Sequence, residues 1–308
     1  MKTALVGYTG FVGSNLAASH HFDNLYNSKN IEEAFGTKPN LLVYAGVRAE
    51  KFLANSHPEE DLRMIQEAEE NIRRIRPVKV ILISTIDVYQ TPIRVDEQSE
   101  ITVSGLQPYG ANRCSLERRV RDIYHDALIV RLPALFGNNL KKNFIYDMLH
   151  PIPSILNAAK MKELSSRISD LHKFYRLQEN GFYRYMGQQE IRNLRKEFEA
   201  VGFTSLQFTD SRSSYQFYNL KYLWKDLTKA LKLDLHLLNL ATEPLNAGEL
   251  YQYITGKEFK NRLLPPVAEY DFRTVHAERM GGTGGYLYSG LQIKEEIKEY
   301  VEKELLKR

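Results

Sequence analysis

Short apolar runs alternate with longer amphipathic stretches through the first 137 residues of the chain. The apolar runs predict strands, at residues 3–7, 22–26, 41–45, 78–84 and 127–132. The stretches between them predict helices, at about residues 11–20, 57–76 and 109–125. Strands that alternate with helices form βαβ units, and the last four runs are typical of strands buried on both faces. We therefore predict an α/β fold with a Rossmann-like, doubly wound parallel sheet.

The pattern changes after Gly137, where residues 138–200 combine several helical stretches with mixed charge and many tyrosines. Two further apolar runs, Leu206–Phe208 and Leu235–Leu240, predict additional strands. This change in sequence pattern indicates a second, smaller domain of mixed α/β structure. We predict the domain bounds as residues 1–137, with sheet additions from 205–242, and residues 138–308.

The composition is that of a globular protein, with 43% hydrophobic and 26% charged residues among 308. A net charge of +4 is too small to indicate a nucleic-acid or membrane partner, and no apolar stretch is long enough to cross a bilayer. Cys114 is the single cysteine, which excludes an intrachain disulfide and favours a reducing compartment. The N-terminus leads straight into a strand without a signal peptide, so we expect a cytoplasmic location. The His, Cys and Asp residues lack metal-ligand spacing, so we expect no structural metal.

Three glycines at a spacing of three, Gly7, Gly10 and Gly13, follow the first predicted strand directly. Such a turn lets backbone N–H groups and a helix N-terminus approach a pyrophosphate without a Cβ in the way. A strand before the glycines and a helix after them is the context that strengthens this interpretation. We therefore predict a dinucleotide-binding loop; the alternative is a tight strand–helix turn in another α/β fold.

Two further segments give the chain a family resemblance. The fourth predicted strand ends in Ser84-Thr85-Ile86-Asp87-Val88-Tyr89, and Pro108-Tyr109-Gly110-Ala111-Asn112-Arg113 follows further along. With these segments the chain resembles the extended short-chain dehydrogenase/reductase family, which includes nucleotide-sugar epimerases, dehydratases and reductases. The resemblance covers most of the chain, and its other pieces are Gly7-x-x-Gly10-x-x-Gly13 and residues 44–49, 131–137 and 239–242.

The resemblance places the family's catalytic residues on three positions. Thr85 takes the place of the Ser/Thr that bonds and polarises the substrate oxygen, and Tyr109 that of the tyrosine that exchanges its proton. Arg113 takes the place of the family's lysine. A free phenol, with a pKa near ~10, is a poor base at neutral pH, and a cation four residues along the same helix face lowers that pKa. The alternatives are a turn residue after proline for Tyr109 and an ordinary strand-end hydroxyl for Thr85.

The resemblance also implies a nicotinamide cofactor, NADP or NAD, held by the loops that follow the strands. We expect the glycine loop to bind its pyrophosphate, with Arg48 adding a charge-assisted bond; a surface arginine is the alternative for Arg48. The predicted cofactor-binding residues are Gly7, Thr9, Gly10, Phe11, Val12, Ala45, Gly46, Arg48, Tyr109 and Arg113, together with Asn27, Ser28 and Lys29.

The end of the second predicted strand decides between the two cofactors. In the family an acid at this point grips the hydroxyls of the adenosine ribose. Asn27, Ser28 and Lys29 stand there instead. An uncharged side chain beside a hydroxyl and a lysine favours the 2′-phosphate of NADP over NAD.

Taken together, the resemblance implies hydride exchange with a nucleotide-activated sugar, catalysed by an epimerase or a keto-reductase. The Thr-Asp-Glu of the family's dehydratases is missing, because Ile86 follows Thr85 and only Asp87 is present. Asp87, Asn138 and Arg212 are the candidate substrate-binding residues, and the second domain is expected to hold the substrate. The expected partner is this small molecule, and a homodimer is a family expectation.

Arginine at position 113 is the main departure from the family's pattern. It keeps the positive charge and has five donors, so it can still hold ribose hydroxyls. It does not deprotonate, however, and so cannot pass on a proton. The sequence therefore leaves a second function open, in which the protein binds NAD(P) as a regulator or sensor without turnover.

Overall fold

The computed structural model describes residues 2–187 and 191–307 of the chain. These residues form two compact units, and the chain passes between them several times. The first unit contains the residues up to Leu140 together with Ser214–Leu245 and Glu269–Glu296. The second contains Lys141–Ser213, Asn246–Ala268 and the residues from Ile297 onwards.

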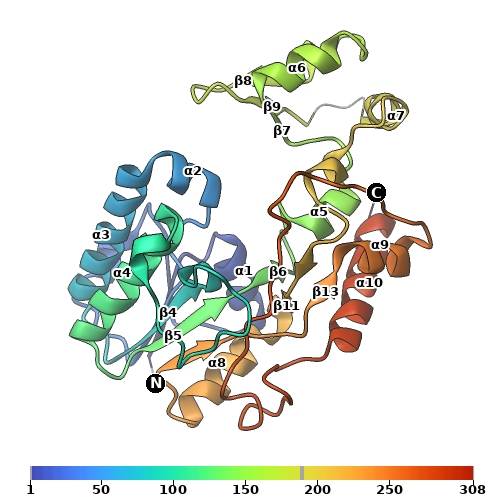
Figure 1. The fold of residues 1–308 in the computed structure, drawn as a ribbon. Helices are drawn as coiled ribbons and strands as arrows, with labels where there is room; N and C mark the ends of the chain where they lie inside the picture. The colour runs from blue at the N-terminus through green and yellow to red at the C-terminus, as the bar shows by residue number, and fades with distance from the viewer. Residues whose placement is uncertain (1, 188–190, 308) are drawn as a thin grey trace. The chain divides into compact units, whose positions relative to one another are not determined.

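A six-stranded parallel sheet forms the centre of the first unit, in the strand order β12-β5-β4-β3-β1-β2 (Figure 1). Its strands are β1 (Thr3–Val6), β2 (Asn24–Tyr26), β3 (Leu41–Tyr44), β4 (Lys79–Thr85), β5 (Leu128–Leu132) and β12 (Leu237–Asn239). From β1 the sheet extends to β2 on one side and to β3, β4 and β5 on the other. This order confirms the predicted doubly wound, Rossmann-like α/β fold.

Helices cover both faces of this sheet (Figure 1). On one face, α1 (Phe11–Ser19) and α8 (Leu223–Lys232) pack their apolar side chains against Leu5 and Val43. On the other face, α3 (Pro58–Ile75) and α4 (Pro108–Ile123) pack against Val6 and Leu42. Neighbouring residues of one strand thus serve opposite cores, because side chains alternate across a sheet.

Local sequence accounts for where the two long helices begin and end. Both α3 and α4 start with a proline, whose missing N–H costs nothing in the first turn. α3 ends where Arg76 adopts a left-handed conformation just before Pro77. A short helix that the sequence pattern did not predict, α2 (Lys51–Ser56), precedes α3 and contacts α4.

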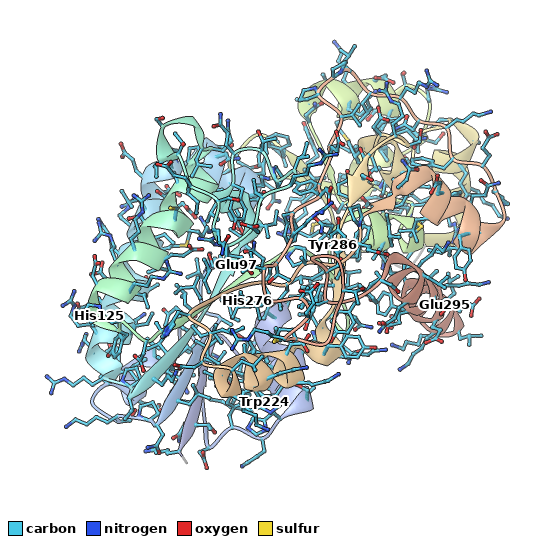
Figure 2. The ribbon with its side chains drawn as sticks, turned by 60° about the horizontal axis from the view of Figure 1, so that its bottom comes forward. Glu97, His125, Trp224, His276, Tyr286 and Glu295 are labelled. Atoms are coloured by element: carbon cyan, nitrogen blue, oxygen red, sulfur yellow. The ribbon has the colours of Figure 1, made fainter. Side chains whose placement is uncertain are left out.

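Shorter elements complete the first unit. β6 (Ala134–Phe136) pairs in parallel with β11 (Phe217–Asn219), and β10 (Ser214–Tyr215) pairs with β13 (Leu245–Asn246). Helix α10 (Gly290–Leu306) begins in this unit and continues in the second. The loop after β4 carries Glu97, labelled in Figure 2, whose carboxylate accepts hydrogen bonds from Asn239 N and Thr274 Oγ1, each at 2.7 Å. Glu97 thereby joins this loop to the end of β12.

A buried polar cluster stabilises the junction of α4 with the sheet. Arg131 of β5 and Glu117 of α4 form an ion pair at 2.6 Å, with both side chains 3% exposed. Burial lowers the pKa of Arg131, but the hydrogen bonds and charge of Glu117 outweigh it, so that pKa lies above its ordinary value. Ser84 donates to the same carboxylate, and Tyr89 accepts a hydrogen bond from Arg131 at 2.8 Å. Several residues of the family-like segments therefore hold the sheet rather than a ligand.

The second unit is smaller and contains an antiparallel sheet in the order β7-β9-β8. Its strands are β7 (Ile155–Leu156), β8 (Tyr175–Leu177) and β9 (Tyr183–Tyr185). Its helices are α5 (Phe144–Leu149), α6 (Ala158–Ser165), α7 (Ile191–Ala200) and α9 (Ala247–Thr255). Leu164 and Phe198 lie at the centre of its core and are fully buried.

The strand predicted at Leu206–Phe208 is wrong. The segment Ser205–Phe208 is a 3₁₀ helix in the second unit. Thr204 and Gln207 close a reciprocal capping box around it, which satisfies the backbone groups locally instead of through a neighbouring strand. The apolar run near Leu235 does contain a strand, β12.

Candidate functional site

Close packing requires glycine at two positions of the loop after β1. Gly7 has φ +92°, and a Cβ there would lie 2.4 Å from the carbonyl oxygen of Ala45. A Cβ on Gly13 would lie 2.1 Å from the carbonyl oxygen of Gly7. The loop is thus pressed between the first turn of α1 and the end of β3. Gly10 is the N-cap of α1 and has no side chain to cover it, so the positive end of the helix stays open.

The structure brings most of the predicted cofactor residues to this loop. Thr9 lies exposed at its tip, while Phe11, Val12 and Ala45 pack partly against the core beneath it. Gly46 follows directly, and a Cβ there would lie 3.0 Å from Val6 Cγ1. The segments after β1 and β3 therefore form one backbone-lined cradle at the carboxyl end of the sheet, where doubly wound folds bind their ligands.

The residues after β2 lie beside the same loop. The N–H of Gly7 donates to the carbonyl oxygen of Tyr26, the last residue of β2, at 2.7 Å. Asn27 then forms a turn by accepting from the N–H of Lys29 at 2.8 Å, and Ser28 and Lys29 are exposed. Asp23 precedes β2 and accepts hydrogen bonds from Thr3 at the amino end of β1, away from the turn.

Thr85 and Tyr109 meet at the carboxyl end of β4. Thr85 is the last residue of β4, and its Oγ1 accepts from the N–H of Asp87 at 3.2 Å. Tyr109 lies in the first turn of α4 and is 7% exposed, and the Thr85 side chain is close enough to influence the pKa of its phenol. The start of α4 touches the loop after β4, because a Cβ on Gly110 would lie 2.0 Å from the carbonyl oxygen of Asp87. The packing of two separate elements therefore brings the two residues to the same end of β4.

Burial is the main influence on Tyr109 and raises the pKa of its phenol. The charge of Arg113 lowers this pKa, that of Asp87 raises it, and Lys51 and the Thr85 side chain lower it again. The balance leaves the pKa above its ordinary value. Tyr109 is consequently a neutral phenol at neutral pH in the ligand-free chain.

Arg113 lies under the ring of Tyr109 rather than beside its hydroxyl. The guanidinium carbon is 3.8 Å from the ring centroid, an arrangement that cation–π attraction favours. Arg113 Nη1 forms an ion pair with Asp61, and Arg113 Nη2 donates to the carbonyl oxygen of Arg48 at 2.6 Å. The side chains of Arg113 and Asp61 are only 5% and 2% exposed. Arg113 is thus committed to contacts within the protein.

Three residues around Tyr109 escaped the sequence analysis: Asp61, Asn55 and Lys51. Asp61 also accepts from Asn112 at 2.8 Å, while Asn55 Oδ1 accepts from the N–H of Tyr109 at 2.9 Å. Lys51 forms an ion pair with Asp87 at 2.7 Å. The acids in the first turn of α3 were the available signal for Asp61, but on sequence alone they indicate only a helix N-terminus.

Asp87, Asn138 and Arg212, the candidate substrate residues, have different surroundings. Asp87 lies beside Tyr109, within the group just described. Asn138 is held to α1 through its backbone, with its N–H and carbonyl oxygen bonded to the Asn15 amide at 3.1 and 2.8 Å. Arg212 belongs to the second unit, where its Nε and Nη2 bind the two carboxylate oxygens of Asp210 at 2.9 and 2.7 Å.

A cavity of about 260 Å³ lies beside the Arg113–Asp61 pair in the first unit. It is lined by the loop after β3 and by α2 and α3, including Arg48, His57 and Asp61. In the described part of the chain, no three His, Cys, Asp or Glu side chains gather where they could hold a metal ion. The described helices are also too short or too polar to span a membrane.

Comparison with solved structures assigns the fold to a class. The UDP-N-acetylglucosamine 4-epimerase of Methanobrevibacter ruminantium has a TM-score of 0.66 and 13% identity, covering 100% of this chain and 99% of its own. RMD from Pseudomonas aeruginosa, solved with NADPH, has a TM-score of 0.65 and 14% identity, covering 100% of both chains. The dTDP-4-dehydrorhamnose reductase of Yersinia enterocolitica has a TM-score of 0.65 and 11% identity, covering 98% of both.

These neighbours share the Rossmann-like α/β fold that the sequence predicts. No family model matches the chain, and no curated protein matches it either. At 11–16% identity the likeness establishes the architecture alone. The reaction therefore has to be argued from the site.

We predict that Gly13→Ala damages both the loop and cofactor binding. The added Cβ cannot fit 2.1 Å from the carbonyl oxygen of Gly7, so α1 must move away from the loop. Overpacking of this kind lowers the free energy of unfolding by about 1–3 kcal/mol. Urea unfolding and calorimetric titration with NADPH and NADH measure the two effects. A variant with native stability and native binding of both nucleotides contradicts the assigned role of the loop.

Proposed function

We propose that the protein is an NAD(P)-dependent enzyme that epimerises or reduces a nucleotide-activated sugar. The observation that carries this proposal is that Thr85 at the end of β4 and Tyr109 at the start of α4 lie close together, in the unit that contains the glycine loop. Such a pair can bind one substrate oxygen and exchange its proton. The location at the carboxyl end of a doubly wound parallel sheet is where this fold places its ligands.

The cradle fits the pyrophosphate of a dinucleotide. Gly7 and Gly13 let the loop pack closely against the end of β3 and the start of α1, and the N-terminus of α1, with Gly10 as its N-cap, favours negative charge. The groups proposed to hold the cofactor are Gly7, Thr9, Gly10, Phe11, Val12, Ala45, Gly46 and Arg48. Asn27, Ser28 and Lys29, with no acid among them, favour the phosphate of NADP over NAD. A bound nicotinamide supplies a site that accepts or returns a hydride.

The two hydroxyls take different parts in this proposal. Thr85 donates a hydrogen bond to the substrate oxygen and fixes its position at the end of β4. Tyr109 gives its proton to that oxygen during reduction and takes it back during oxidation. Because its pKa is raised, Tyr109 carries its proton at neutral pH, and this protonation state favours reduction of the substrate.

The solved neighbours suggest the substrate class. They include a UDP-N-acetylglucosamine 4-epimerase in complex with UDP-N-acetylmuramic acid, a UDP-glucose 4-epimerase with UDP-glucose, and dTDP-4-dehydrorhamnose reductases. Another neighbour is an NDP-hexosamine 5,6-dehydratase. Dehydration is less favoured here, because Asp87 is ion-paired with Lys51 and Ile86 stands beside it. The cytoplasmic location and the homodimer stay predictions from sequence.

One prediction of the proposed function concerns turnover on a panel of UDP-, dTDP- and GDP-sugars. We expect NMR to detect epimerisation or cofactor-dependent reduction of at least one of them by the native protein. Tyr109→Phe removes the exchanged proton, so its rate should fall by about 100-fold or more. Tyr124→Phe, at the far end of α4, is the matched control and should keep native turnover. Undiminished turnover by Tyr109→Phe would refute the proposed role of this phenol.

Another prediction of the proposed function concerns how the reaction rate depends on pH. Burial raises the pKa of Tyr109, so its proton is fully present at neutral pH and is lost only as the pH rises through that higher value. Reduction should therefore stay constant at neutral pH and slow at alkaline pH, whereas oxidation should accelerate as the pH rises. Profiles of kcat/KM in both directions between about pH 6 and pH 10 test this. Profiles of equal sign in the two directions would contradict it.

One observation favours the second function, binding without turnover. Arg113 is held by Asp61 and by the carbonyl of Arg48, so it does not reach out as a free cation. A binder of this kind would retain the cofactor and leave every nucleotide sugar unchanged.

The variant Arg113→Lys separates the two functions. Lysine keeps a charge for Asp61 but loses the bond to Arg48 and the stacking on Tyr109. For an enzyme that uses native Arg113, we expect turnover to fall by about tenfold. Turnover in the lysine variant but not in the native protein would assign the native chain to the binding class.

A further inference from the structure

Helix α2 brings a second cation to Tyr109. Lys51 is the first residue of α2, and Asn55 of the same helix accepts a hydrogen bond from the N–H of Tyr109 at 2.9 Å. This bond connects the short helix to the backbone of Tyr109. The side chain of Lys51 is 48% exposed, so substituting it leaves the core intact.

Lys51 reaches the group around Tyr109 through Asp87. Its Nζ lies 2.7 Å from Asp87 Oδ1, and the N–H of Asp87 donates to Thr85 Oγ1 at 3.2 Å. The carbonyl of Asp87 in turn lies against Gly110, the residue after Tyr109. The charged groups that face Tyr109 are thus Lys51 from α2, Asp87 from the loop after β4, and Arg113 from its own helix.

The two cations differ in what they can do. Arg113 stacks under the ring, is buried, and has its guanidinium bonded to Asp61, Arg48 and the Tyr109 carbonyl. A guanidinium keeps its proton under all ordinary conditions, whereas an ammonium can release one and regain it. Lys51 is half-exposed, so it can exchange such a proton with water.

We propose that Lys51 supplies the exchangeable ammonium that arginine at position 113 does not provide, and that it acts through Tyr109. The inference rests on the proposed function and adds a positioning residue to it. Arg113 then serves as the fixed cation that holds the ring, while Lys51 is the cation that stabilises the phenolate and relays its proton. Asp87 holds the ammonium in place at the end of β4.

The decisive measurement requires no substrate. A trifluorotyrosine at position 109, whose acidity brings its titration into reach, is followed by ¹⁹F NMR in native, Lys51→Met and Lys51→Gln proteins. Loss of a nearby positive charge should raise the pKa of residue 109 by about one unit in both variants. Lys79→Met removes a lysine from the opposite end of β4 and should leave that pKa unchanged. An equal pKa in native and both Lys51 variants overturns the proposal.

Turnover provides a second, separate readout. On any sugar that the native protein converts, Lys51→Met should lower kcat by about tenfold, and added ethylamine should restore part of it. A structural role alone predicts no rescue by the amine, so a loss without rescue would overturn the relay. If the native protein converts no sugar on the panel, the proposed function is wrong. The fluorine titration would still decide whether the charge of Lys51 lowers the pKa of residue 109.

Discussion

The buried ion pair between Arg113 and Asp61 is the contact on which the geometry of the site depends. It joins α4 to α3, and through the carbonyl of Arg48 it also holds the loop after β3. Charges buried to this extent are stable only when paired, so neither partner can leave without a large cost. The ring of Tyr109 rests on the guanidinium, and the start of α4 is fixed against Asp87. One interaction therefore sets the position of the phenol relative to both the glycine cradle and the end of β4.

This use of Arg113 separates two tasks that a single residue can combine. Holding the ring requires a planar, permanently charged group that bonds several partners, and arginine meets that requirement. Tuning the phenol requires a charge that acts on its pKa, and we propose that Lys51, ion-paired with Asp87, provides it. Burial still dominates and keeps the pKa of Tyr109 high, so the site favours donating a proton over accepting one. The arrangement is compatible with an enzyme whose cations are divided between two helices.

Part of the family-like pattern serves the scaffold. Tyr89, Arg131 and Asn239 come from three such segments, yet they bond one another and Glu117 inside the first unit. Their task is to satisfy polar groups where α4, β5 and β12 meet, which keeps the carboxyl ends of the strands in register. Arg212 likewise binds Asp210 within the second unit. The family-like segments thus contain residues that hold the sheet beside the residues that we propose to be catalytic.

The sequence by itself determined the strands β1 to β5, the helices α1, α3 and α4, the glycine loop and the positions of Thr85 and Tyr109 at element ends. These follow from local rules: side-chain periodicity, proline at helix starts, and glycine where a Cβ would collide. Only the tertiary structure decided the partners of those residues. Asp61 meets Arg113 across 52 residues and Lys51 meets Asp87 across 36, and no local pattern encodes such approaches. The run at 206–208 became a 3₁₀ helix for the same reason, because whether an apolar run pairs as a strand depends on a neighbouring strand being there.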